Sequence, residues 1–263
     1  MEVVTPRSLD EALDVKARRP DAVPIQGGTD VMVELNFDRR RPEVLLNLNE
    51  VAELRGWSRD DGVLRLGSGL TYAEAMRPPL AELLPALAEA SRTVGSPQIR
   101  NRGTLGGNLG TASPAGDALP PLLVERGVVE LASARGVRTL PLQEFLVGPK
   151  RNAAEPDELI TAVVVSPSEA PQTFMKIGPR NAMVIAVSSL AVLADSARGE
   201  LRAAFGSCGP VVGVVTCPVE ESASLPDRVV AAASPIDDVR GSAAYRRHSL
   251  RVLATRALER CSV

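Results

Sequence analysis

The sequence predicts an α+β protein made of two or three compact units. Short stretches rich in branched apolar residues alternate with stretches of helical periodicity over the first two thirds of the chain. The last third differs, because three apolar stretches follow one another and two helical stretches come after them. At 263 residues the chain exceeds a typical single domain. Alternating strands and helices place it in the α+β or α/β class.

The expected first unit, residues 1–55, begins with a helix. Ser8 and Glu11 have the spacing of a capping box, which predicts a helix through about residue 18. A strand, a glycine turn, a helix and a second strand follow, at residues 23–25, 26–30, 31–36 and 44–48. Together they form one small α/β unit.

The expected second unit spans residues 56–166. A turn at residues 60–62 precedes an alternating strand, and Thr71 with Glu74 repeats the capping-box spacing. The predicted elements after these are a helix over residues 80–90, a leucine-rich helix past Asp117, and strands at 63–66, 128–131, 137–140 and 160–165.

Prolines at residues 167 and 171 mark residues 167–172 as a linker to the third unit, residues 172–263. This unit is predicted to be an antiparallel sheet with helices on it. The strands are expected at residues 173–177, 183–193 and 201–205, with a hairpin turn at 196–199, and the helices at 226–233 and 243–261.

Composition excludes several classes of protein. Lys and Arg total 30 and Asp and Glu total 32, so no long-range field favours nucleic acid or an anionic membrane. The three cysteines, Cys208, Cys217 and Cys261, are odd in number and widely spaced, which argues against disulfides and fits a reducing cytoplasm.

The single histidine, His248, has no second ligand near it, so no metal site is expected, and we expect it on a helix surface. No apolar run is long enough to cross a bilayer and the N-terminus has no signal-peptide pattern, so a cytoplasmic protein is expected.

Two glycine-rich turns, residues 26–30 (QGGTD) and 104–108 (TLGGN), carry the functional prediction. Neither glycine of a Gly-Gly pair has a Cβ, so the main chain can approach a ligand and point N–H groups at it. Each pair runs into a possible helix start, where free N–H groups favour an anion. The two turns therefore suggest one long ligand with a diphosphate in its middle.

Ordinary loop chemistry is the alternative for either turn alone, because glycine is common wherever a turn needs a positive φ. The surroundings of the second turn favour a ligand, since residues 94–117 are dense in small and polar types that bury little apolar area. A third glycine-rich sequence, residues 67–69 (GSG), lacks the rest of a dinucleotide fingerprint and is interpreted as a turn.

These motifs, in this order, resemble the FAD-binding medium subunit of the molybdenum hydroxylases, as in bacterial xanthine dehydrogenases and carbon monoxide dehydrogenases. The resemblance covers nearly the whole chain, and the ordered set is more specific than any one member. It rests on residues 24–30, 100–108, 112–114 and 117, and then on 156–160, 176–180 and 240–247. It implies the vanillyl-alcohol-oxidase or PCMH-type flavin fold, with two N-terminal subdomains that clasp FAD and a smaller C-terminal domain.

The resemblance also implies which residues hold FAD. Main-chain N–H groups of Gly27, Gly28, Thr29, Gly106 and Gly107 would bind the pyrophosphate. Lys176 would lie near the isoalloxazine edge of the flavin, where its positive charge favours reduced flavin. An exposed strand lysine is the plain alternative. The predicted cofactor-binding residues are Pro24, Ile25, Gln26, Gly27, Gly28, Thr29, Asp30, Val94, Thr104, Leu105, Gly106, Gly107, Asn108, Ser113, Asp117, Ile160 and Lys176.

One motif departs from the family. Mammalian-type xanthine dehydrogenases carry a Gly-Tyr-Arg whose tyrosine lies over the flavin, whereas this chain has Gly148, Pro149 and Lys150. That difference puts the transfer of their NAD and oxygen behaviour in doubt. Arg180 could guide a nicotinamide or a partner's cofactor, or it could be structural. The stretch from Tyr245 to Arg247 is interpreted as a helix start, with a subunit contact as the alternative.

The resulting functional prediction is an electron-transfer subunit with no catalytic side chain of its own. FAD would be bound non-covalently, since no histidine or cysteine neighbours either glycine motif. Electrons would come from a small 2Fe-2S subunit, with hydroxylation on a large molybdopterin subunit, in a heterotrimer that dimerises. NAD is one expected acceptor. Alternatives are the medium subunit of a carbon monoxide or aromatic-heterocycle dehydrogenase, a stand-alone reductase of the same flavin fold, and a scaffold that has lost its cofactor.

Overall fold

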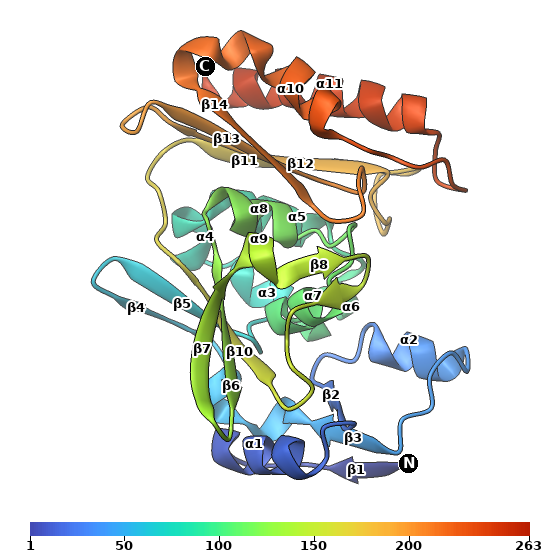
Figure 1. Ribbon diagram of the computed structural model, residues 1–263. Coiled ribbons are helices and arrows are strands. Elements are labelled where there is room, and N and C mark those ends of the chain that lie inside the picture. Colours follow the sequence, from blue (N-terminus) through green and yellow to red (C-terminus); the bar gives the residue numbers. More distant parts are fainter.

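The computed structural model describes residues 1–263 and contains three main sheets that follow one another along the molecule. In Figure 1 the N-terminal sheet lies at the bottom, the middle sheet above it and the C-terminal sheet at the top. The fold is therefore mixed helix and sheet, as the sequence predicts.

The N-terminal sheet has three parallel strands in the order β1-β3-β2. The strands are β1 (Glu2–Val4), β2 (Val23–Ile25) and β3 (Val44–Asn47), with helices α1 (Leu9–Arg18) and α2 (Val31–Asn36) between them. Ser8 caps α1 by accepting a hydrogen bond from the Glu11 amide. Short 3-10 turns, Leu48–Glu50 and Ala52–Leu54, lead to the next unit. The sequence did not indicate β1; the other helices and strands lie where it placed them.

The middle sheet is antiparallel, with the order β4-β5-β10-β6-β7. Its strands are β4 (Trp57–Asp60), β5 (Val63–Gly67), β6 (Val128–Ser133), β7 (Gly136–Pro141) and β10 (Leu159–Val165). The helices of this region are α3 (Tyr72–Ala75), α4 (Leu80–Leu83), α5 (Pro85–Thr93), α6 (Pro97–Arg102), α7 (Leu105–Thr111), α8 (Leu119–Val124) and α9 (Leu142–Phe145). A small hairpin of β8 (Leu146–Gly148) and β9 (Arg151–Asn152) completes it.

The prediction of a single helix over residues 80–90 is wrong, because the structure has two helices there, α4 and α5. Leu84 between them has non-helical backbone angles, with φ of −133° and ψ of 66°, and Pro85 opens α5. Proline disfavours a helical conformation at the residue before it, so the break follows from the sequence. The short helices α6 and α9 and the β8–β9 hairpin were not predicted.

The C-terminal sheet is an antiparallel meander of β11 (Gln172–Ile177), β12 (Ser188–Asp195), β13 (Glu200–Gly206) and β14 (Gly213–Pro218). Helices α10 (Leu225–Ala232) and α11 (Ala243–Cys261) cover its outer face, while α5 and α8 contact the other face (Figure 1). The sheet is thus joined to the middle unit through helices rather than through shared strands. Strand β14 was not anticipated.

The strand predicted over residues 183–193 begins later than expected. Residues 183–187 form a loop, in which Met183 has a left-handed φ of 54°. The Val187 amide donates to the Ile177 carbonyl at 2.8 Å, and regular pairing starts at Ser188. The apolar composition of this loop resembles a strand, but tertiary hydrogen bonds decide its path.

Helix α11 begins at Ala243, so the stretch from Tyr245 to Arg247, which was interpreted as a helix start, lies in its first turns. Arg246 is buried, and its guanidinium donates to the carbonyls of Val187 and Ser207 and to the carboxylate of Asp238. His248 is exposed. The three cysteines are free and buried, no cluster of His, Cys, Asp and Glu could hold a metal ion, and no helix is both long and apolar enough to span a bilayer.

Candidate cofactor site

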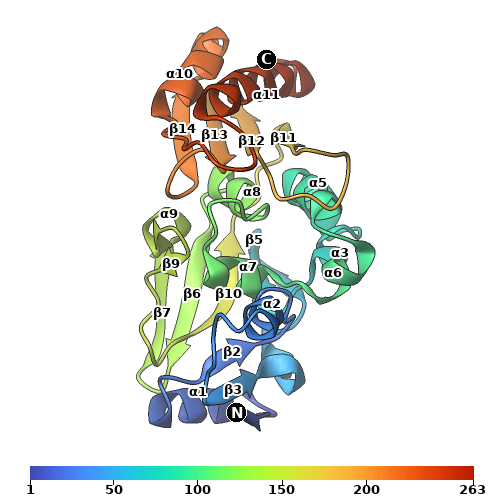
Figure 2. The same ribbon diagram turned by 90° about the vertical axis from the view of Figure 1, so that its right-hand side faces the viewer.

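A cavity of about 380 Å3 lies between the first and the second unit. Figures 1 and 2 show β2, α2 and α7 in this part of the molecule, where the N-terminal and middle sheets adjoin. Both glycine-rich turns contribute to its wall, as does the start of β10. The predicted site residues that line it are Pro24, Ile25, Gln26, Gly27, Gly28, Thr29, Asp30, Thr104, Gly106, Gly107, Asn108 and Ile160.

The first glycine turn packs directly on the chain between α6 and α7. A Cβ added at Gly27 would lie 2.8 Å from the carbonyl carbon of Arg102 and 3.1 Å from the Cα of Gly103. The Arg102 guanidinium donates to the Gln26 carbonyl at 3.2 Å, and Thr111 Oγ1 donates to Asp30 Oδ2 at 2.8 Å. Glycine at position 27 is therefore what allows the two units to close around the cavity.

The backbone amides of this turn are free. None of the N–H groups of Gly27, Gly28, Thr29 and Asp30 donates to an acceptor in the protein. Gly27, Gly28 and Thr29 are half-buried and Asp30 is exposed, so water or an external acceptor must satisfy these four amides. Gly28 has a φ of 74°, a conformation that glycine adopts without strain. This run of amides suits an anion such as a diphosphate.

The second glycine turn differs from the prediction, because its amides are already used. The Gly106 N–H donates to the Ser68 carbonyl at 2.7 Å, and the Gly107 N–H donates to Thr104 Oγ1 at 3.0 Å. Thr104 is the N-cap of α7, so its side-chain oxygen already accepts one hydrogen bond within the helix. What this turn offers is space: a Cβ at Gly107 would meet only Thr104 Oγ1, at 3.2 Å.

Two buried polar atoms of the cavity wall have no hydrogen-bond partner. They are Ser68 Oγ, between β5 and α3, and Asn108 Oδ1, in α7. Both atoms would be satisfied by hydroxyl or amide groups of a bound ligand. Residues 67–69 were predicted only to form a turn. Ser68 does lie in a turn, but no local sequence pattern indicates that it also lines the cavity.

Five predicted residues, Val94, Leu105, Ser113, Asp117 and Lys176, lie outside the cavity, and two of them, Asp117 and Lys176, form a buried ion pair. Lys176 Nζ is 2.7 Å from Asp117 Oδ2, and it also donates to the Thr93 carbonyl, next to Val94, and to the Val184 carbonyl. Burial raises the pKa of Asp117, and the neighbouring Lys176 acts in the opposite direction. The lysine charge therefore faces Asp117 here. Ser113 accepts a hydrogen bond from the Ala115 amide.

Leu105 was also assigned to the cofactor, and the structure places it elsewhere. Its side chain is fully buried in the core of the middle unit, and its amide donates to the Leu70 carbonyl at 2.9 Å. Leucine at this position anchors α7 to the core, and this fixes where the adjacent glycines lie.

The segment that departs from the family motif reaches the cavity through its last residue. Lys150 lines the wall with a left-handed φ of 54°, its amide donates to the Ala112 carbonyl, and its Nζ lies 4.0 Å from Glu34 Oε1. Pro149 does not line the cavity. Arg180 is exposed and donates to the carbonyls of Ala182 and Met183, which is the structural alternative for this arginine.

Comparison with known proteins identifies the family. A family model described as the FAD binding domain in molybdopterin dehydrogenase matches residues 1–168. The chain belongs to this family. It is an FAD-binding subunit of the molybdenum hydroxylase type, the class of oxidoreductases in which the molybdenum cofactor and iron–sulfur clusters lie on partner subunits.

Relatives of known name agree with this assignment. The chain is 33% identical to a xanthine dehydrogenase FAD-binding subunit of Escherichia coli O157:H7, over 77% of this chain and 72% of the relative. It is 34% identical to the nicotinate dehydrogenase FAD-subunit of Eubacterium barkeri, over 74% and 70%. It is 31% identical to the nicotine 6-hydroxylase medium subunit of Paenarthrobacter nicotinovorans, over 97% and 94%.

A solved structure shows the same fold. The protein superposes on a chain of carbon monoxide dehydrogenase from Hydrogenophaga pseudoflava with a TM-score of 0.92, covering 100% of this chain and 97% of the other at 24% identity. The residues of the cavity also fit FAD, because unpaired amides, two unpartnered polar atoms and a glycine surface match a ligand with a diphosphate and hydroxyl groups.

Proposed function

We propose that this subunit passes electrons from a partner's iron–sulfur clusters to an external acceptor such as NAD, in an enzyme of the xanthine dehydrogenase type. Bound FAD supplies chemistry that accepts electrons singly and releases them in pairs. The protein binds and orients the cofactor and needs no general base. The observation that carries the proposal is the run of four unpaired amides, Gly27 to Asp30, on the wall of a cavity closed by two units.

Within this proposal the two glycine turns have different tasks. The amides of the first turn hold the diphosphate, and the glycine surface of α7 lets the cofactor lie against the helix. Asn108 and Ser68 supply hydrogen bonds from the side, and Ile160 supplies apolar contact. Non-covalent binding follows from the wall, which contains no cysteine or histidine.

The proposed partners are a small 2Fe-2S subunit and a large molybdopterin subunit, in a heterotrimer that dimerises. Support comes from the medium-subunit relative and from the family description, which names a molybdopterin dehydrogenase. The alternative is the medium subunit of a carbon monoxide dehydrogenase or an aromatic-heterocycle dehydrogenase. The nicotinate and nicotine relatives support an aromatic heterocycle as the alternative substrate class.

A stand-alone reductase would need a proton donor beside the flavin. Tyr72 is the phenol on the cavity wall, and burial raises its pKa far above the ordinary value. A phenol that holds its proton this firmly is a poor acid at neutral pH. Tyr72 is therefore a poor candidate for the proton donor that a reductase would need.

The proposal is tested in two steps. The purified chain should bind about one FAD per molecule and quench its fluorescence; a chain that stays colourless with added FAD contradicts the cofactor site. The native assembly should then reduce NAD, a quinone or oxygen with a purine, nicotinate or carbon monoxide as the donor. Reduction of a dye at the molybdenum subunit, with no reduction of any of the three acceptors, would contradict the proposed electron path.

A further inference from the structure

One part of the cavity wall has almost no regular structure to support it. Residues 152–158 connect the end of β9 to β10, and three of them, Asn152, Ala154 and Glu158, line the cavity. They lead directly into Leu159 and Ile160, which also line it. Such a loop needs specific contacts to keep a fixed position against a ligand.

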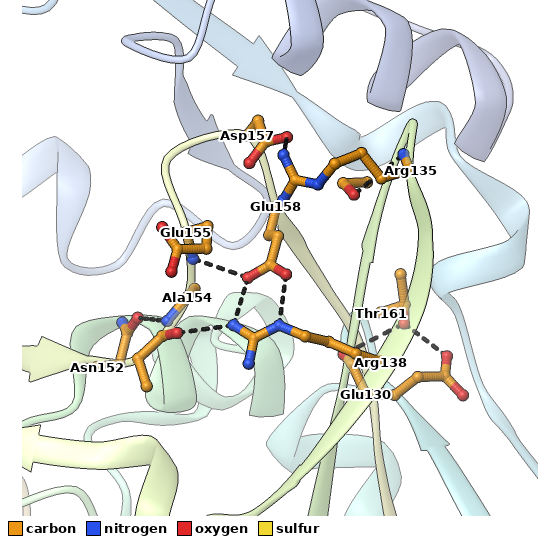
Figure 3. A network of polar contacts seen from close by, with 11 residues as sticks. Glu130, Arg135, Arg138, Asn152, Ala154, Glu155, Asp157, Glu158 and Thr161 are labelled. Carbon is orange, nitrogen blue, oxygen red and sulfur yellow. Dashed lines mark hydrogen bonds and ion pairs between the residues drawn. The ribbon is translucent and has the colours of Figure 1, made fainter.

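The loop is held by one nearly buried carboxylate. Glu158, with 3% of its side chain exposed, accepts two hydrogen bonds from the Arg138 guanidinium, at 2.6 and 2.8 Å (Figure 3). The same carboxylate accepts the Glu155 amide at 2.7 Å, and Arg138 also donates to the Ala153 carbonyl at 2.9 Å. Arg138 therefore contacts both ends of the loop at once, and its hydrogen bond lowers the pKa of Glu158.

Arg138 comes from the edge strand β7, which otherwise has little to pack against. Residues 136–139 are exposed, and Val137 is 65% exposed. Arg135, in the turn that precedes β7, contacts Asp157, so two arginines of one hairpin meet two adjacent acids of the loop (Figure 3). On its cavity side the loop is joined to α7 by Asn152, which donates to the Gly110 carbonyl at 2.8 Å.

We propose that Arg138 and Glu158 are positioning residues for FAD, which hold residues 152–158 against the cavity and slow the release of the cofactor. This inference rests on the proposed FAD site. Loss of Arg138 would leave a nearly buried carboxylate without its partner, and the loop would open to hydrate it. Because Arg138 lies behind the wall and acts on the cavity only through Glu158 and the loop, its loss should change the dissociation rate more than the association rate.

The test compares Arg138→Met and Arg138→Lys with a matched control. Arg65→Met breaks a similar two-bond pair, Arg65 with Glu130, on the same sheet, and neither of those residues lines the cavity. For each variant, the FAD dissociation rate is measured by flavin fluorescence. Hydrogen exchange of the Ala154 and Glu155 amides is measured in the cofactor-free chain, and unfolding is followed by denaturant.

Arg138→Met should release FAD roughly 10- to 100-fold faster, as expected for charged hydrogen bonds, and should expose the two amides to exchange. Arg138→Lys should recover part of the effect, because the positive charge remains but a single ammonium replaces the two-pronged guanidinium. Arg65→Met should lower stability but leave FAD release unchanged. If Arg138→Met does not fold, Arg138→Lys carries the test with a smaller increase expected.

Two results would overturn the inference. One is wild-type FAD release in the arginine variants; the other is an equal acceleration in Arg65→Met, which would make the effect one of general stability. A wild-type chain that binds no FAD would instead overturn the proposed function itself, so the two failures are distinguishable.

Discussion

Replacing Gly107 with alanine is expected to separate FAD binding from folding. A Cβ at this position would meet only Thr104 Oγ1, at 3.2 Å, on a helix surface that lines the cavity. At the preceding Gly106 a Cβ would lie 2.5 Å from Ser68 Cβ and 2.7 Å from the Ser68 carbonyl oxygen. The first change adds a methyl group to the ligand surface, whereas the second adds one inside the protein.

The magnitudes follow from these neighbours. Alanine in place of a glycine within α7 stabilises the helix by roughly 0.5–1 kcal/mol. Crowding of the Thr104 cap offsets part of this gain, since such a cap contributes about 1 kcal/mol. The cofactor-free Gly107→Ala chain should therefore unfold within about 1 kcal/mol of the wild type. A methyl group pressed against bound FAD costs about 1–3 kcal/mol, or roughly 10- to 100-fold in affinity.

Fluorescence titration with FAD and denaturant unfolding of the cofactor-free chain give both quantities from the same preparations. Gly106→Ala serves as the control, because it should lose stability by about 1–3 kcal/mol as well as affinity. Unchanged FAD affinity in a folded Gly107→Ala chain would refute the reasoning, since the cofactor would then not lie on this face of α7.

Two further changes test the buried charges. Lys176→Met should lower the unfolding free energy by about 3–5 kcal/mol, because Asp117 stays buried without its partner; unchanged denaturation would contradict this. Burial raises the pKa of Glu125 from 4.5 to about 7. The folded state then holds this proton more tightly than the unfolded state, so the unfolding free energy should fall by up to about 3 kcal/mol as the pH rises through that interval. Glu125→Gln should remove the fall, and identical pH profiles would show that the donors Gln172 and Ser168 keep the carboxylate charged.

Local signals predicted most of the fold. Helices α2 and α11 have the predicted bounds, and Thr71 with Glu74 forms the reciprocal capping box that their spacing indicates. These features depend on residues within one or two turns of each other, so the sequence shows them directly. The break before Pro85 was equally local and could have been predicted from the proline alone.

Long-range contacts decided what the sequence could not show. Residues 183–187 are apolar like a strand, yet the Val184 carbonyl accepts a hydrogen bond from Lys176, and the segment stays a loop. Ser68 enters the cavity only because the Gly106 amide docks on its carbonyl. Arg138, in β7, meets Glu158, in the loop before β10, 20 residues further along the chain. No short window of the sequence contains both partners of either of the last two contacts.

The two Gly-Gly pairs show why a glycine motif is informative only together with its surroundings. In each pair the first glycine packs against protein: Gly27 on the chain at Arg102, and Gly106 on Ser68. The second glycine lies on the cavity wall with no backbone close to it: a Cβ at Gly28, whose φ is 74°, would meet only the side chains of Met32 and Ile25, and one at Gly107 only Thr104 Oγ1. Glycines that only permit chain-to-chain packing would have backbone neighbours at both positions of the pair. The alternation within each pair is therefore what a wall between two units requires when its outer surface must also accept a ligand.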